Sequence, residues 1–204
     1  MSTEVKPFSV DISEEALIDL KQRLANTRWP EAETVDDWSQ GVPLSYIKEL
    51  CEHWQNDYDW RRWEKQLNSY PQFKTEIDGL NIHFLHVRSP HADALPLVMT
   101  HGWPGSIVEF HKVIEPLTNP TKFGGKAEDA FHLVCPSLPG YGFSDKPAST
   151  GWGVEQIGKA WGKLMARLGY DSYCAQGGDW GAMVTQNIAL TETAHCIGIH
   201  TTMP

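Results

Sequence analysis

The sequence has no long apolar run and no cluster of basic residues. Nothing in its 204 residues approaches the ~18 consecutive apolar residues of a membrane-spanning helix, and the opening MSTEVKP lacks the apolar core of a signal peptide. Lys and Arg are scattered along a chain of net charge −9, which argues against a surface that binds nucleic acid or anionic membranes. These absences predict no nucleic-acid partner, no membrane partner and, by default, a cytoplasmic location.

Cysteine is also scarce, and metal-ligand spacings are missing. The four cysteines show no CxxC pair, so reduced and mostly buried thiols are expected. His83 and His86 are three residues apart in a predicted strand, which places them on opposite faces and makes them poor joint metal ligands. The sequence therefore predicts no metal site. The cysteines are Cys51, Cys135, Cys174 and Cys196.

Residues 1–72 form the first predicted domain, which is helical. Asp11 or Ser13 is a suitable cap for a helix that ends at Trp29-Pro30, and a second helix is expected to start near Pro43. A third is expected to carry the apolar residues of 60–67. Nine tryptophans are many for this length, and those in this region lie on apolar stripes. They predict helix packing and a docking surface rather than ligand contacts.

Residues 73–204 form the second predicted domain, an α/β sheet. Strands at 73–77 and 80–87 flank Asp78-Gly79, a pair suited to a type I′ hairpin turn. Short apolar runs at 97–100, 131–135, 172–175 and 196–200 alternate with helical patterns at about 106–117, 153–168 and 180–190. The resulting fold class is α/β, a helical region followed by a doubly wound, mostly parallel sheet.

The most informative segment is Tyr173–Gly181, YCAQGGDWG, which predicts a strand, a sharp turn and a helix. Small residues two before and two after Asp179 match the nucleophile elbow, in which a tight turn presents one side chain to the active site. The side chain here is a carboxylate. Carboxylate attack on carbon gives an alkyl ester, which indicates epoxide opening or halide displacement rather than ester cleavage.

Two further motifs follow predicted strands. His101–Ser106, HGWPGS, lies where a strand–loop junction supplies a backbone N–H to an oxyanion hole. The run 136–144, PSLPGYGFS, is a Pro- and Gly-defined loop after another strand, where open α/β sheets form their ligand crevice. His101 is interpreted as a hydrogen-bonded histidine that holds its turn, in preference to a proton-transfer group.

Together, HGWPGS, PSLPGYGFS and GGDWG resemble the epoxide hydrolases, specifically the microsomal-type branch, in sequence, order and spacing. The helical region is similar to the N-terminal domain of that family, including the phrases RWP at 28–30 and YDWR at 58–61. The resemblance implies an α/β-hydrolase fold and an enzyme that hydrolyses small epoxides to vicinal diols in detoxification. It implies that Asp179 is the nucleophile, that backbone N–H groups of Trp103 and Trp180 form the oxyanion hole, and that no cofactor is needed.

The resemblance also implies a cis peptide at Trp103-Pro104. Members of the family continue into a lid with two tyrosines and then supply a base histidine, whereas only 23 residues follow Gly181. The sheet is therefore expected to be incomplete at its C-terminal side, with His200 outside the base position and Tyr141 and Tyr173 outside the lid. A homo-oligomer or a complementing C-terminal chain remains open as a partner.

Two other functions remain open at this point. Haloalkane dehalogenases also use an elbow aspartate, often followed by tryptophan, so Asp179-Trp180 alone does not separate the two enzymes. HGWPGS and the helical region favour the epoxide hydrolase. The second alternative is an inactive chain that acts as a binding module or as half of a two-chain enzyme, because an incomplete sheet exposes an edge strand and apolar surface.

Overall fold

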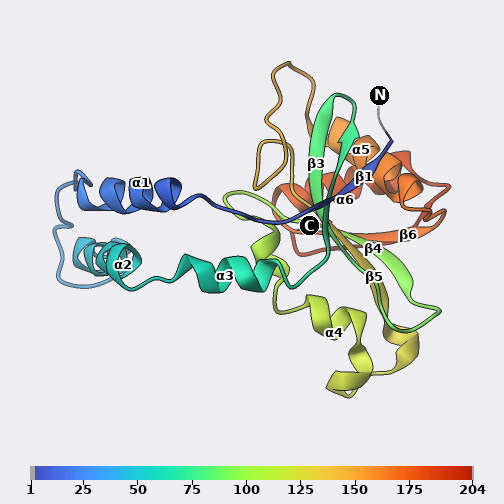
Figure 1. Ribbon diagram of the computed structural model, residues 1–204, viewed down its shortest axis with the longest axis horizontal. Coiled ribbons are helices and arrows are strands. Elements are labelled where there is room, and N and C mark those ends of the chain that lie inside the picture. The colour runs from blue at the N-terminus through green and yellow to red at the C-terminus, as the bar shows by residue number, and fades with distance from the viewer. Residues whose placement is uncertain (1–2, 204) are drawn as a thin grey trace. The chain divides into compact units, whose positions relative to one another are not determined.

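The computed structural model describes residues 3–203, which form two compact units (Figure 1). Val10–Leu67 make up a helical unit. The residues before and after it, up to Ser9 and from Asn68 onward, make up a unit built on one sheet. Both the expected helical region and the expected α/β core are present.

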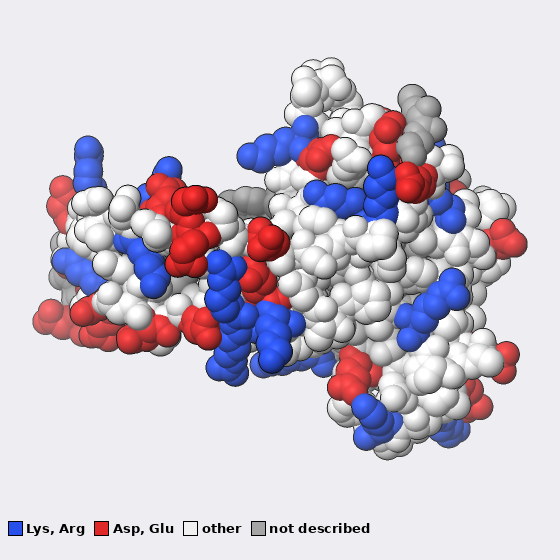
Figure 2. Space-filling model, in the orientation of Figure 1, with Lys and Arg blue, Asp and Glu red and all other residues white. Residues whose placement is uncertain are grey.

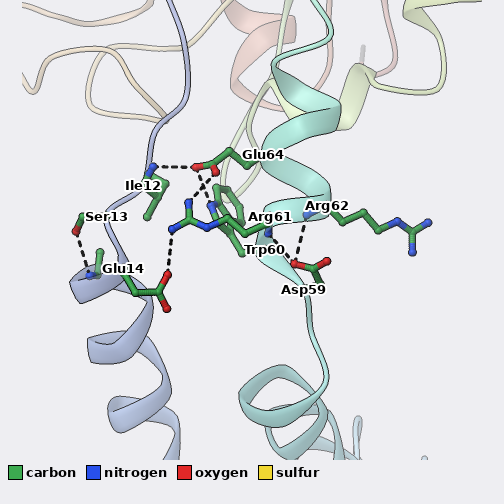
Figure 3. A network of polar contacts seen from close by, with 9 residues as sticks. Ile12, Ser13, Glu14, Asp59, Trp60, Arg61, Arg62 and Glu64 are labelled. Carbon is green, nitrogen blue, oxygen red and sulfur yellow. Dashed lines mark hydrogen bonds and ion pairs between the residues drawn. The ribbon is translucent and has the colours of Figure 1, made fainter.

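The helical unit contains α1 (Glu14–Ala25), α2 (Leu44–Asn56) and α3 (Trp60–Leu67). Ser13 caps α1 by accepting the Ala16 N–H at 3.3 Å, so the serine of the two expected caps is the one used. In the middle of α3, Glu64 accepts the Ile12 N–H at 2.8 Å and pairs with Arg61 at 2.7 Å (Figure 3). These polar contacts connect the segment before α1 to α3.

Apolar side chains of the helical unit remain partly accessible. Neither α1 nor α2 contains a buried residue, and Trp38 and Trp54 are 59% and 43% exposed. Trp38 nevertheless packs edge-on against Tyr46, with ring centroids 5.3 Å apart. Charged side chains of both signs are interspersed on the face shown in Figure 2. Trp38 and Trp54 thus retain exposed apolar surface, although Trp38 also packs on Tyr46.

The second unit is a seven-stranded mixed sheet with strand order β1-β2-β3-β5-β4-β6-β7 among the described residues. The first three strands are antiparallel to their neighbours, and β3 pairs antiparallel with β5. From β5 onward the pairs are parallel. The strands are β1 (Val5–Phe8), β2 (Gln72–Ile77), β3 (Leu80–Val87), β4 (Leu95–Thr100), β5 (Phe131–Pro136), β6 (Tyr173–Gly177) and β7 (Cys196–Thr201).

The β2–β3 hairpin forms where the sequence predicts it. Asp78 and Gly79 have φ angles of 50° and 87°, the positive values that both central residues of a type I′ turn require. The prediction of helix alone before residue 72 is wrong at Val5–Phe8, which form β1 against β2. Four residues are too few to show strand alternation, and an edge strand tolerates Pro7 because one side needs no N–H donor.

Helices α5 (Val154–Arg167) and α6 (Trp180–Thr191) enclose the main core against one face of the sheet (Figure 1). Alternate strand residues such as Val98, Val134 and Ala175 point into this core, as the period of two requires. Trp161 of α5 is fully buried, and its indole N–H donates to Thr100 Oγ1 at 3.1 Å. The helix that follows the elbow, α6, contributes Val184 and Ile188 to the same core.

The helix expected at about 106–117 is interrupted. The structure has a 3-10 turn, η1 (Ile107–Phe110), followed by a short α4 (Ile114–Thr118). Pro116 has no N–H for the helical bond to residue 112, and it is accommodated in the first turn of α4, where that bond is not made. The loop at 118–130 contains two further 3-10 turns, η2 (Pro120–Phe123) and η3 (Ala127–Asp129).

Candidate active site

Asp179 lies at the tip of a sharp turn between β6 and α6. Its backbone has φ 50° and ψ −128°, a strained conformation for a residue with a side chain, and it is the residue just before the first turn of α6. The carboxylate is exposed rather than buried in the sheet. This geometry is that of a nucleophile elbow, as the sequence predicts.

Glycines around the tip make this turn sterically possible. A Cβ on Gly177 would overlap the carbonyl oxygen of Gly181, and a Cβ on Gly181 would overlap that of Thr100. A Cβ on Gly102, in the loop after β4, would occupy the position of the Asp179 carboxylate. The close approach of strand, helix and loop therefore depends on the absence of side chains at these positions.

The Asp179 carboxylate is held by the two backbone groups that the sequence analysis selects. Its Oδ1 accepts the Trp103 N–H at 2.6 Å. Hydrogen bonds from the Trp180 and Trp103 N–H groups lower the pKa of Asp179 below its ordinary value, outweighing a small opposing effect of desolvation. The carboxylate is thus ionised at neutral pH and fixed in orientation. The indoles of both tryptophans are exposed, at 66% and 52%.

His101 connects the loop after β4 to the loop after β5. Its Nδ1 lies 3.0 Å from the carbonyl oxygen of Gly102, and its Nε2 accepts the Leu138 N–H at 3.1 Å. The first contact needs a proton on Nδ1 and the second needs a free lone pair on Nε2, so the bridge requires the neutral imidazole. Burial lowers the pKa of His101, which favours that form. The interpretation of His101 as a turn-holding histidine is confirmed by these contacts.

The Trp103-Pro104 peptide is cis.

A buried polar group also supports the loop after β5. His83 lies in β3, with its Nδ1 2.9 Å from Ser137 Oγ and its Nε2 3.0 Å from Gln72 Oε1. Ser144 Oγ donates to the Ser137 carbonyl at 2.7 Å and closes the loop. His101 therefore connects the HGWPGS loop to the PSLPGYGFS loop, and His83 connects the PSLPGYGFS loop to β2. Strand periodicity alone does not reveal these contacts.

Other residues considered from the sequence do not reach the carboxylate. His200 is exposed on β7, where it pairs with Gln176, and it has no contact with Asp179 among the described residues. Tyr141 packs against the His101 ring, with centroids 5.5 Å apart. Sequence reasoning missed Glu109, whose side chain lies against the HGWPGS loop. The feature of the sequence that could have indicated this contact is the four-residue spacing between Gly105 and Glu109.

Comparison with known proteins agrees with this geometry. A family model of the epoxide hydrolase N terminus matches residues 5–110, and a model of the alpha/beta hydrolase fold matches residues 96–204. The chain belongs to the epoxide hydrolase family. Its fold is that of the alpha/beta hydrolases, with a mixed sheet that is parallel from β5 to β7 among the described residues.

Individual relatives show the extent of the match. The chain is 58% identical over 200 residues to the "Putative epoxide hydrolase" of Stigmatella aurantiaca, covering 98% of this chain and 46% of that protein. It is 40% identical to epoxide hydrolase 1 of Oryctolagus cuniculus, covering 98% of this chain and 45% of that one. The crystal structure of juvenile hormone epoxide hydrolase from Bombyx mori superposes with a TM-score of 0.89 at 35% identity, covering 99% and 48% of the two chains.

The chain spans about half the length of the relatives that it matches. Within residues 3–203, no helix has the length and apolar character that crossing a bilayer requires. The same residues contain no group of three or more His, Cys, Asp or Glu side chains arranged to hold a metal ion.

Proposed function

We propose that the chain carries the nucleophilic part of an epoxide hydrolase site, with Asp179 as the nucleophile and a small epoxide as the substrate. The 2.6 Å contact between Trp103 N and Asp179 Oδ1, on a strained and glycine-flanked elbow, carries this proposal. It fixes one carboxylate oxygen and leaves Oδ2 to attack. The epoxide hydrolase relatives support the reaction class.

The first step is formation of an alkyl ester. Oδ2 of Asp179 attacks an epoxide carbon, the C–O bond of the ring breaks, and its electron pair leaves on the ring oxygen as an alkoxide. Oδ1 becomes the carbonyl oxygen of the ester. Because Trp103 N–H already binds Oδ1, the ester carbonyl forms at a hydrogen-bond donor without rearrangement.

The second step is hydrolysis of that ester. Water attacks the ester carbonyl carbon, and the negative charge that develops on Oδ1 is stabilised by the N–H groups of Trp103 and Trp180. Collapse of the tetrahedral intermediate breaks the bond between the carbonyl carbon and the alkyl oxygen, which releases the vicinal diol and regenerates the Asp179 carboxylate. Both donors stabilise the charged carboxylate in the resting site, which supports their assignment as the oxyanion hole.

The alkoxide needs a proton donor and the hydrolytic water needs a base. We propose that lid tyrosines and a base histidine are supplied by a segment like the further half of the longer relatives, either in the same polypeptide or in a complementing chain. An open apolar groove of about 570 Å³ beside β4, β6 and β7 supports such a partner. Ile199 of the edge strand β7 lines this groove and is 46% exposed, and Ile197 of the same strand is 58% exposed.

The alternatives are not favoured. Haloalkane dehalogenation rests on Asp179-Trp180 alone, whereas the matching family model and relatives are epoxide hydrolases. An inactive binding module would not need an ionised carboxylate that two N–H donors hold at a strained elbow, whereas a nucleophile does. The cytoplasmic location, the role in detoxification and a homo-oligomeric state stay predictions.

Incubation of the 204-residue chain with styrene oxide, or in parallel with a bromoalkane, tests the reaction class. A small fraction of the chain is expected to gain the mass of one epoxide equivalent, because the lid tyrosines proposed to protonate the alkoxide come from another segment. Repeated turnover to diol and bromide release are not expected. Multiple turnover to diol would refute the proposed need for further catalytic groups. Bromide release without epoxide addition would instead support the dehalogenase.

A further inference from the structure

The Glu109 side chain folds back onto the loop that carries Trp103. A Cβ on Gly105 would coincide with Glu109 Oε1, so the carboxylate fills the space that a side chain at position 105 would need. The backbone reinforces this fold, because the Glu109 N–H donates to the Ser106 carbonyl at 3.0 Å within η1. The carboxylate therefore lies against the middle of the HGWPGS loop.

Hydrogen bonding and charge also connect Glu109 to the site. Partial desolvation raises the pKa of Glu109 above its ordinary value, and the N–H groups of Ser106 and Gly102 oppose this effect. The negative charge of Asp179 raises the pKa further. The two N–H groups lie on either side of Trp103 in the sequence, so a single carboxylate interacts with both ends of the loop.

The loop is thus held between two carboxylates, each packed on a glycine. Asp179 lies against Gly102 and accepts the Trp103 N–H, whereas Glu109 lies against Gly105. We propose that Glu109 is a positioning residue that holds the HGWPGS loop so that the Trp103 N–H faces the Asp179 carboxylate. A contribution of this arrangement to catalysis rests on the proposed function. The arrangement itself can be tested without any enzymatic turnover.

The backbone amide of Trp103 reports the arrangement directly. A pH titration of its NMR signal in the 204-residue chain is expected to show one step for Asp179, below the ordinary 3.8, and a second for Glu109, above the ordinary 4.5. In Glu109→Gln the upper step is lost and the signal moves upfield at neutral pH, because the loop relaxes away from Asp179. If Glu109 does not hold the loop, the Trp103 signal of Glu109→Gln is expected to stay in its parental position at neutral pH.

Gly105→Ala supplies an independent perturbation. Its methyl group displaces the Glu109 carboxylate, so the Trp103 signal is expected to move in the same direction as in Glu109→Gln. The double variant is expected to show no more than the larger single effect, because both changes remove one interaction. Glu115→Gln, on the exposed pair with Lys122, is the matched control and leaves the signal in place.

An unchanged Trp103 signal in both Glu109→Gln and Gly105→Ala, in spectra that keep their dispersion, would overturn the proposal. So would additive shifts in the double variant. If the NMR spectrum of one variant loses its dispersion, that variant is unfolded and the other variant decides the question. The upper titration step of the Trp103 signal in the parent chain is a third, independent measurement. Because no epoxide is used, failure here is distinct from failure of the proposed function, which is read from alkylation of Asp179.

Discussion

The buried imidazole of His83 makes the stability of the sheet unit depend on pH. The ring is fully buried, and both of its nitrogens are hydrogen bonded within the fold. Burial, assisted by the charge of Lys74, lowers the pKa of His83 from 6.5 to about 3. The folded chain therefore keeps this imidazole neutral at pH values where the unfolded chain protonates it.

The sign and size of the effect follow from proton linkage. Above pH 6.5 both states hold a neutral ring, and the full stability is present. As the pH falls below 6.5 the unfolded state gains a proton that the folded state does not, so stability is lost until the folded pKa is reached. At pH 5 the expected loss from His83 is about 2 kcal/mol, at ~1.4 kcal/mol for each pH unit. This is a large part of a typical net stability of about 5–15 kcal/mol.

Urea denaturation followed by far-UV circular dichroism at pH 7.5 and pH 5.0 measures this loss. His83→Phe keeps an aromatic ring between Phe8 and Phe143 but cannot be protonated. It is expected to be less stable than the parent at pH 7.5 but to lose about 2 kcal/mol less on acidification. His200→Gln, which removes an exposed histidine, is the control for the loss of a histidine as such. An equal loss in His83→Phe and the parent would refute the reasoning.

Three further changes test the loops and the helical unit. His101→Leu removes both bridging contacts and leaves two buried backbone groups without partners, an expected cost of about 1–3 kcal/mol each, measured by thermal unfolding. Gly181→Ala forces a methyl group into the Thr100 carbonyl and is expected to cost at least ~1–3 kcal/mol, measured by urea denaturation. Glu64→Gln weakens the contact with the Ile12 N–H, so that amide is expected to exchange with deuterium faster.

Two of these changes have a matched control. Gly124→Asn changes a glycine of φ 84° that has open space around it, and asparagine tolerates the left-handed region better than other residues with a side chain, so it is expected to lose less stability than Gly181→Ala. Glu52→Gln, on the exposed surface of α2, leaves exchange at Ile12 unchanged. A parental melting temperature for His101→Leu would contradict the bridging role of the imidazole.

The sequence was sufficient for elements whose signal is local. Asp78-Gly79 determines its hairpin because few other residue pairs accept two positive φ angles. The glycines around Asp179 similarly determine the elbow, and HGWPGS determines the loop beside it. In each case a few neighbouring residues allow only one backbone conformation without a steric clash.

Features that depend on distant partners could not be predicted. Val5–Phe8 become a strand only because β2 is available as a neighbour, and four residues contain too little periodicity to show it. The side chain of Glu109 is an ordinary helix-start carboxylate in the sequence, and its position on Gly105 follows from the tertiary path of the loop. The contact of His101 with Leu138 is likewise a long-range one.

The central claim is that Asp179 attacks the epoxide carbon. After incubation of the chain with styrene oxide, tandem mass spectrometry of its peptides is expected to locate the added alkyl group on Asp179. The isosteric Asp179→Asn is expected to remain unmodified at this position, because its amide is a poor nucleophile. Alkylation of other side chains with Asp179 unmodified, or equal modification of the position in Asp179→Asn, would contradict the account.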